Sequence, residues 1–289
     1  MSNLQLFAAC VAIWGSTWIA ITFQLGAVAV EASVAYRFLI GSAIAFAYCR
    51  IRGVPVLFSA AQHRWVAFQG VLMFSLSYVA VYYAEQYIVS GLAAVAYSVS
   101  PLLNLVMLRV IFGTPVSGKI ALGGLLGVVG IVLVFWPEFA RFEEGGDPAL
   151  GAFLAMLSVF ISAAGSMAAH RSHVLQLPLW PTMAWGMLYG SLLTFSYALL
   201  MGRPLGFEPT LAYVASLLYL AGAGSILAFG AYLTLLGRIG AARAGYVGVM
   251  VPIVALAVSW AFEGYEWTWL AAAGVAVSVV GNVVILRRG

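Results

Sequence analysis

The sequence has few charged residues and almost no cysteine. Only 8% of its 289 residues are charged, whereas 64% are hydrophobic, and the mean hydropathy is +1.05. Soluble domains carry roughly 25% charged residues, so this composition excludes an ordinary soluble protein. The two cysteines, Cys10 and Cys49, lie in apolar segments. They offer neither a disulfide framework nor a thiolate metal centre, and we expect no metal or other cofactor.

The chain also lacks a cluster of basic residues, although its net charge is +4 and its pI is near 9.1. Nucleic-acid binding requires Lys and Arg gathered on one solvated face. Here the 13 basic residues stand singly between apolar runs. We therefore expect membrane lipid and a small-molecule substrate as partners, and no nucleic acid.

What the sequence has in abundance is long apolar runs. Runs long enough to cross a bilayer recur along the whole chain, and the first is too long and lacks the basic start of a cleavable signal peptide. We predict an all-α integral membrane protein with ten transmembrane helices. The expected spans are 4–23, 31–49, 66–86, 88–111, 119–136, 149–169, 179–200, 210–236, 241–262 and 267–286.

The basic residues predict the orientation of these spans. With a cytoplasmic N-terminus, only Arg37, Arg141 and Arg203 of the 13 basic residues fall on the outer side. Positively charged loops stay in the cytoplasm. We therefore expect both termini to be cytoplasmic.

The two halves of the chain resemble each other. A polar stretch, 137–148, separates 1–137 from 149–289, and at an offset of 151 residues Pro101 matches Pro252 and Tyr78 matches Phe229. Because each half holds five spans, an odd number, the second half must be inverted relative to the first. Inverted repeats are typical of transporters, whose substrate site lies between them near the bilayer midplane.

Three motifs carry a family resemblance: Trp14-Gly15-Ser16-Thr17, Arg37-Phe38 and Ser100-Pro101. With the helix count and inversion, the chain resembles the drug/metabolite transporter superfamily, in particular its ten-helix EamA-type members, over essentially its whole length. Within that superfamily it looks most similar to YddG-type amino-acid exporters. The resemblance implies a multi-pass protein of the bacterial inner membrane that exports aromatic and other neutral amino acids. It also implies two EamA-type repeats, 1–137 and 149–289, with a central cavity inside the first four helices of each. One departure is the sixth span, which has no Trp-Gly pair.

Aromatic side chains with polar tips are the main candidates for substrate contact, because they can stack on a solute and also hydrogen-bond to it. Phe74, Tyr78, Tyr82 and Glu85 form one stripe on their helix. The competing interpretation is a packed core. The predicted substrate-binding residues are Trp14, Phe74, Tyr78, Tyr82, Tyr97, Asn104, Trp185, Tyr189 and Tyr246.

A second group of residues is predicted to act in gating. Arg37 is the only basic residue well inside a span, and a buried charge is costly there unless it is paired. It could bind a substrate carboxylate, close an outer gate with Glu31, Glu85 or Glu263, or extend to the interface. The family resemblance favours a structural or gating role. The predicted gating or hinge residues are Arg37, Glu85, Pro101, Gly248 and Pro252.

The expected function is therefore export by alternating access. The first span has no carboxylate and no Asp or Glu falls at mid-depth, so coupling to protons through a mid-membrane carboxylate is not expected. Export of drugs or other metabolites and a channel-like pore remain alternatives. An intramembrane hydrolase is disfavoured, because Asp147 is the only aspartate and the histidines lie at span ends. We expect no enzyme activity.

Overall fold

The computed structural model describes residues 1–113, 118–140 and 147–286, and in these ranges every regular element is helical. Seven helices there are long and apolar enough to cross a membrane. The first four of these run over Asn3–Thr22 (α1), Val30–Ile51 (α2), Ala60–Ala84 (α3, Ala60–Val71; η1, Leu72–Leu76; α4, Ser77–Ala84) and Ser90–Phe112 (α5, Ser90–Ala96; η2, Tyr97–Val99; α6, Ser100–Phe112).

The other three long spans are Pro148–Val174 (α8), Leu179–Leu200 (α9) and Leu211–Leu235, which joins α10 (Leu211–Leu218), η4 (Tyr219–Leu227) and the start of α11 (Ala228–Ala244). Three shorter apolar stretches, Ala121–Pro137, Tyr246–Phe262 and Trp269–Val284, lie in α7 (Gly118–Ala140), α12 (Tyr246–Phe262) and α13 (Trp269–Leu286). Each expected span has a helical counterpart in this order.

The helix ends differ most from expectation at three places, and one of them is the end of α8 at Val174, where the span was expected to end at 169. The span expected at 66 begins at Ala60, because Ser59 and Gln62 form a capping box that starts the helix earlier. The expected break between 236 and 241 was wrong, since α11 continues to Ala244 and α12 begins after Gly245. The expected spans were taken from apolar runs, and a helix can continue beyond the end of its apolar run. The helix ends were therefore harder to predict than the helices themselves.

Three of the spans are interrupted by non-α turns. The residues Leu72–Leu76 and Tyr219–Leu227 are π-helical, and Tyr97–Val99 form a 3₁₀ turn just before Pro101. In contrast, Pro252 lies inside the continuous helix α12. Wide turns of the π type loosen the backbone hydrogen-bond ladder and occur frequently at functional sites.

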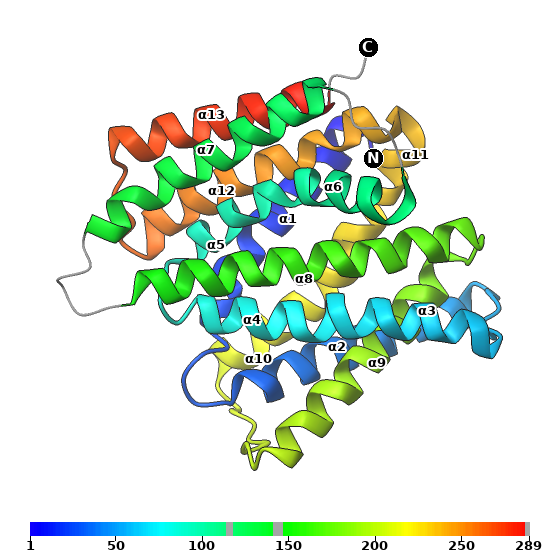
Figure 1. Ribbon diagram of the computed structural model, residues 1–289. Helices are drawn as coiled ribbons and strands as arrows, with labels where there is room; N and C mark the ends of the chain where they lie inside the picture. The colour runs from blue at the N-terminus through cyan, green and yellow to red at the C-terminus, as the bar shows by residue number, and fades with distance from the viewer. Residues whose placement is uncertain (114–117, 141–146, 287–289) are drawn as a thin grey trace.

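The helices pack in a layered bundle (Figure 1). Helix α7 runs beside α13, α2 beside α9, and α4 beside α8, while α1 contacts both α11 and α12. Glycines allow the α7–α13 approach, because a Cβ on Gly130 would lie 2.5 Å from the carbonyl oxygen of Gly274. Small residues at such contacts are typical of helix packing in membranes.

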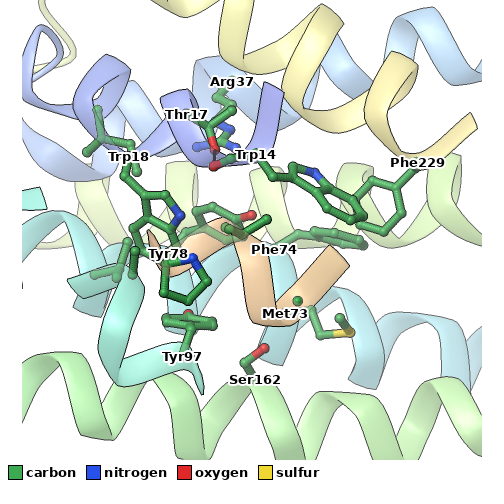
Figure 2. Close-up of a pocket in the computed structure, with 16 residues that line it drawn as sticks. Trp14, Thr17, Trp18, Arg37, Met73, Phe74, Tyr78, Tyr97, Ser162 and Phe229 are labelled. Atoms are coloured by element: carbon green, nitrogen blue, oxygen red, sulfur yellow. Dashed lines mark hydrogen bonds between the residues drawn. The ribbon is translucent and has the colours of Figure 1, made fainter. Parts of the chain in front are cut away.

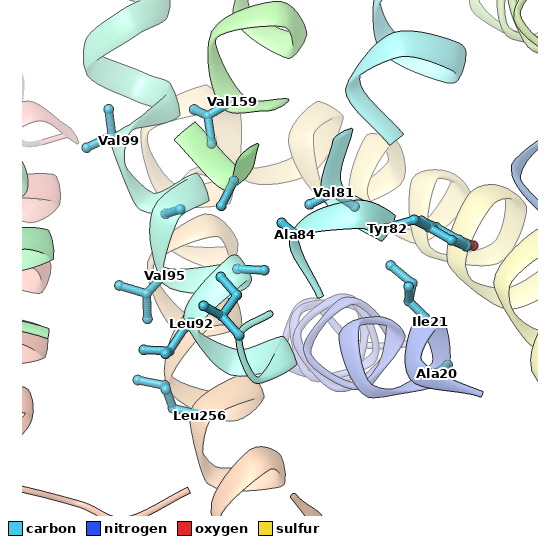
Figure 3. Close-up of a cluster of buried hydrophobic side chains, with 14 of the residues drawn as sticks. Ala20, Ile21, Val81, Tyr82, Ala84, Leu92, Val95, Val99, Val159 and Leu256 are labelled. Carbon is cyan, nitrogen blue, oxygen red and sulfur yellow. The ribbon is translucent and has the colours of Figure 1, made fainter. Parts of the chain in front are cut away.

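A large cluster of buried apolar side chains extends through the bundle, and Figure 3 shows part of it. It joins α1, α4, α5 and α12 through residues such as Ile21, Val81, Leu92 and Leu256, all of which are at most 3% exposed. The part of this cluster around Ile21, Ala84 and Leu92 lies where α1 and α4 end and α5 begins, and we call this part the sealed end.

Candidate functional site

A cavity of about 310 Å³ lies in the middle of the bundle (Figure 2). Side chains from α1, η1, α4, α5, η2, α8, α11 and α12, with Arg37 of α2, surround it. Its volume is at the lower end of the range for small-molecule sites. The lining residues are Trp14, Thr17, Trp18, Ile21, Arg37, Met73, Phe74, Tyr78, Val81, Ala94, Tyr97, Ser162, Phe229, Gly248, Val251 and Pro252.

Six of the 16 lining residues are aromatic, and several of these rings pack edge to face. The ring centroids of Trp14 and Phe229 are 5.2 Å apart, and those of Trp18 and Tyr97 are 5.1 Å apart. The Nε1–H of Trp14 donates to the carbonyl of Gly224 at 3.1 Å, in the π-helical segment η4. The rings therefore project from helices that are tied to one another across the two halves of the chain.

The hydroxyl groups beside the cavity are largely satisfied. The Tyr97 hydroxyl lies 2.9 Å from that of Ser77 and 2.5 Å from that of Ser158. The Thr17 hydroxyl donates to the carbonyl of Trp14 at 2.8 Å. Ser162 also lines the cavity. These groups fix the wall and add a few polar positions to an otherwise apolar surface.

Arg37 brings a positive charge to this wall. Its side chain is 3% exposed, and the guanidinium carbon lies 4.6 Å from the ring centroid of Tyr78. Nη1 donates to the Tyr82 hydroxyl at 3.5 Å, which is long for a hydrogen bond, and Nε has no partner. Within the residues that the structure describes, no carboxylate lies at ion-pair distance from Arg37.

None of the three glutamates named as possible partners forms an ion pair with Arg37 in the described part of the chain, so the salt-bridge alternative is not formed in this structure. Glu31 accepts a hydrogen bond from the Tyr83 hydroxyl at 2.8 Å and lies 3.9 Å from Arg203. Glu85 is buried, and neither of its oxygens has a hydrogen-bond partner in the described part of the chain. It lies within electrostatic range of Arg37 without touching it.

The third expected partner, Glu263, binds within the sealed end. It accepts from the backbone N–H of Ser90 at 3.2 Å and from the Ser90 hydroxyl at 2.5 Å, and the Ser259 hydroxyl also donates to it. This contact joins the start of α5 to the end of α12. The three glutamates were grouped on the outer side by sequence, but their side chains have separate environments.

The structure brings seven of the predicted site residues to one cavity. They come from the substrate-binding and the gating groups, and they are Trp14, Arg37, Phe74, Tyr78, Tyr97, Gly248 and Pro252. Tyr82 is fully buried one turn beyond Tyr78, where its hydroxyl faces Arg37.

Other predicted residues lie away from the cavity lining. Trp185 donates to the carbonyl of Val56 at 2.8 Å, and the Tyr189 hydroxyl lies 2.8 Å from Nδ1 of His63, so both rings pack against the loop before α3 and its first turn. The remaining residues outside the lining are Asn104 and Glu85, Pro101 in the first turn of α6, and Tyr246 at the start of α12.

Sequence reasoning missed several lining residues. Trp18 was not singled out, although it stands four residues after Trp14 and so shares its helix face. Phe229 was noted only as the repeat counterpart of Tyr78, and Ser162 was not among the predicted site residues. Helical spacing and the repeat offset were the signals that could have identified these three residues.

A second hollow of about 340 Å³ adjoins the cavity. It shares Trp14 and Gly248 with it and is also lined by Pro101, Tyr232 and Gly245. These residues lie toward the start of α12 and the end of α11, the side on which α1 also begins. The cavity therefore continues toward that side, whereas the sealed end lies on the other.

Comparisons with known proteins also indicate a membrane transporter. The sequence model of the EamA-like transporter family matches residues 1–136 and again residues 149–287. The chain is 28% identical to the uncharacterized inner membrane transporter YedA of Escherichia coli K12 over 287 residues, which cover 96% of this chain and 90% of that protein. An uncharacterized transporter of Buchnera aphidicola is 25% identical over 104 residues, 36% of this chain and 35% of that one.

The fold is also similar to that of a solved crystal structure, with a TM-score of 0.70 and 20% sequence identity, covering 98% of this chain and 96% of the other. The apolar helices and the inner-membrane relative identify a multi-pass protein of the bacterial inner membrane. The family match covers almost the whole length, so the chain belongs to the EamA-like transporter family, which is part of the drug/metabolite transporter superfamily.

Proposed function

We propose that this transporter exports amino acids, the aromatic and other neutral ones as in the YddG-type exporters, or similar small metabolites, by alternating access. The central cavity is its substrate site. The observation that carries the proposal is the set of aromatic rings from both halves of the chain, Trp14 and Tyr78 with Phe229, around one cavity of about 310 Å³. Such rings can stack on a flat or apolar side chain and leave polar tips for the rest of the solute.

We propose that all ten apolar helices cross the membrane. Beyond the seven long spans, α7, α12 and α13 hold 23, 17 and 18 residues. A bilayer core of about 30 Å requires roughly 17 to 25 helical residues. These three helices therefore have the length and the apolar composition for the task.

We also propose that 1–137 and 149–289 are inverted repeats. Two features support this assignment. The π segment Tyr219–Leu227 includes the position 151 residues after Leu72, where the other π segment begins. The contacts are reciprocal, since α1 packs on α11 and α12 just as α8 packs on α4 and α6, while α2–α9 and α7–α13 each pair equivalent helices.

With the N-terminus in the cytoplasm, as the basic residues indicate, the second hollow supports an opening of the cavity on the cytoplasmic side. The sealed end then faces the exterior. This arrangement corresponds to an inward-facing state, in which an exporter would load its substrate. Rocking of the two halves would open the sealed end and close the hollow.

None of the residues that line the cavity is Asp or Glu. A proton relay through a mid-membrane carboxylate therefore has no candidate in the cavity itself, which favours exchange or movement down a gradient. The sealed end, with Glu263 linked to Ser90, disfavours a continuous channel. Export of drugs or other metabolites remains the alternative for the same cavity.

The test is uptake of labelled phenylalanine, threonine and methionine into proteoliposomes that contain the purified protein. Tyr78→Ala removes a cavity wall, and Tyr197→Ala removes a tyrosine that is 45% exposed on α9. We expect saturable phenylalanine uptake that falls about tenfold or more in Tyr78→Ala, since one lost aromatic contact costs roughly 1 kcal/mol beyond the area that it buries.

The control Tyr197→Ala should transport as the wild type does. An imposed proton gradient should leave the initial rate unchanged. If none of the three amino acids is taken up, the amino-acid assignment is wrong and the cavity serves other metabolites. Equal loss in both tyrosine variants would contradict the assignment of the substrate site to the cavity.

A further inference from the structure

The cavity wall carries a positive charge that no carboxylate of the described residues contacts. Arg37 is buried, and in the part of the chain that the structure describes its Nε has no hydrogen-bond partner and its only hydrogen bond, to the neutral Tyr82 hydroxyl, is 3.5 Å long. A buried charge in a membrane protein is costly unless an opposite charge or a strong acceptor stabilises it. The site is therefore incomplete in the empty protein.

The guanidinium belongs to the lining of the cavity. Gly224, in the π segment η4, lets the backbone pack closely beside it, because an added Cβ would lie 2.8 Å from Cγ2 of Thr17 and 3.8 Å from Nη2 of Arg37. Thr17 lies at the same wall, beside Arg37 (Figure 2). The charged group is thus exposed to the cavity and not enclosed by protein on every side.

The rest of the lining favours a negatively charged ligand over a positively charged one. Among the lining residues there is one cation and no carboxylate. The aromatic faces could in principle attract a cationic ligand, but the guanidinium already lies over the Tyr78 and Phe38 rings, at 4.6 and 5.3 Å. In an apolar site Arg37 would also repel a second cation.

We propose that Arg37 is the carboxylate subsite of the cavity, and that the transporter selects monocarboxylates with an aromatic or apolar body over amines that lack the carboxylate. This inference rests on the proposed function, because it assumes that the cavity is where the substrate binds. A guanidinium can hold a carboxylate with two parallel N–H···O bonds, which fixes the orientation of the solute. The aromatic rings then receive its side chain.

The proposal makes the carboxylate, and not the amino group, the recognised feature of an amino acid. Deaminated aromatic acids should therefore compete with amino acids for the site. Glu85 does not occupy the subsite, since it is absent from the cavity lining and does not contact Arg37. The substrate carboxylate would be the first anion to touch the guanidinium.

The first experiment uses the wild-type protein and a matched ligand series. Phenylalanine is a zwitterion, 3-phenylpropionate an anion and phenethylamine a cation, and all three carry a phenyl ring on a short chain. Binding is measured by calorimetry on the purified protein in detergent, and inhibition by uptake of labelled phenylalanine into proteoliposomes. We expect phenethylamine to bind about tenfold to hundredfold more weakly than the two carboxylates, the range expected for losing a hydrogen-bonded charge.

The second experiment removes the charge. In Arg37→Gln the three ligands should bind with similar affinity, whereas Arg109→Gln, which alters an exposed arginine on α6, should keep the wild-type order. If Arg37→Gln does not fold, Arg37→Lys is used, which keeps the charge but loses the planar fork, and should retain the preference for carboxylates with weaker binding of both.

The outcomes separate this inference from the proposed function. Phenylalanine transport that phenethylamine inhibits as strongly as 3-phenylpropionate would overturn the carboxylate subsite and leave the amino-acid exporter intact. If phenylalanine is not transported, but 3-phenylpropionate binds and Arg37→Gln abolishes that binding, the amino-acid exporter is wrong and the carboxylate subsite stands. Binding of the carboxylates that is unchanged in Arg37→Gln would also overturn the subsite.

Discussion

The contact between α7 and α13 and the central cavity are built from opposite kinds of residue. At the closest points between α7 and α13 the residues are glycines, and Gly130 and Gly274 bring the two backbones together. Around the cavity the side chains are large rings, which leave about 310 Å³ unfilled. In a bilayer, where lipid offers no hydrophobic drive between helices, close contact stabilises and unfilled space does not.

This difference separates stability from transport. The α7–α13 contact should tolerate no added volume, while its alteration should affect transport only through folding. Truncation of a side chain in the cavity wall should have little effect on folding, because that side chain already faces empty space on one side. Variants in the two regions should therefore fail in different assays.

The largest effect is expected at the contact itself. In Gly274→Leu the new side chain would meet the backbone of α7, where an added Cβ already lies 2.6 Å from the carbonyl oxygen of Gly130 and 2.8 Å from the backbone nitrogen of Val134. Because the backbone cannot move aside without disturbing α7, we expect the free energy of unfolding to fall by about 3 kcal/mol or more, which is the upper part of the range for overpacked cores. Thermal unfolding in detergent, followed by tryptophan fluorescence, measures it.

The matched control is Gly127→Ala on α7, where an added Cβ meets nothing within 4 Å. It should be neutral, or stabilise the protein by about 0.5 to 1 kcal/mol through helix propensity. Equal melting temperatures for the leucine variant and the wild type would show that α7 and α13 are not in close contact.

A cavity variant should lose transport and keep the fold. Phe229→Ala removes the ring that packs edge-on against Trp14, from the half of the chain opposite to Tyr78. We expect the KM for phenylalanine to rise about tenfold, as for loss of one aromatic wall, with a much smaller change in melting temperature. Concentration-dependent uptake gives the KM.

The corresponding control is Phe160→Ala, which removes a phenylalanine that is 54% exposed on α8. Its KM should match that of the wild type. If Phe229→Ala instead melts as early as Gly274→Leu while its KM is unchanged, the ring is a structural residue and the distinction between the two regions fails.

The smallest effect is expected at Trp185, which sequence placed in the substrate site and the structure places against the loop before α3. Trp185→Phe loses one hydrogen bond, to the carbonyl of Val56. We expect a loss of about 1 kcal/mol of stability and uptake within about twofold of the wild type. A tenfold rise in the KM of Trp185→Phe would show that Trp185 contacts the substrate, as the sequence predicted.

The helices and part of the cavity could be predicted from the sequence for clear physical reasons. Apolar runs of bilayer length have few alternatives to helix, and helical spacing placed Phe74 and Tyr78 on one face. Position along a span gives the depth of a residue but not the direction in which it faces. Trp185 and Tyr189 lie near the middle of α9 and yet turn toward His63.

The environment of Arg37 could not be predicted for a related reason. Its burial follows from its place inside a span, but its neighbours come from other helices, and three glutamates with similar depth were equally plausible partners. Only the packing shows that Glu31 and Glu263 bind Tyr83 and Ser90 instead. The π segments, which help to shape the cavity wall, have no local sequence signature that we could use.

The most direct test of the central claim is substrate protection of a cysteine placed in the cavity. Ser162→Cys puts a thiol on the lining, and the wild-type chain is a suitable background because Cys10 and Cys49 are both fully buried. The rate of labelling by a small methanethiosulfonate reagent is measured with and without phenylalanine. If the cavity is the substrate site, phenylalanine slows the labelling at concentrations near its KM for uptake. Labelling that phenylalanine leaves unchanged, in a variant that still transports it, would contradict the account.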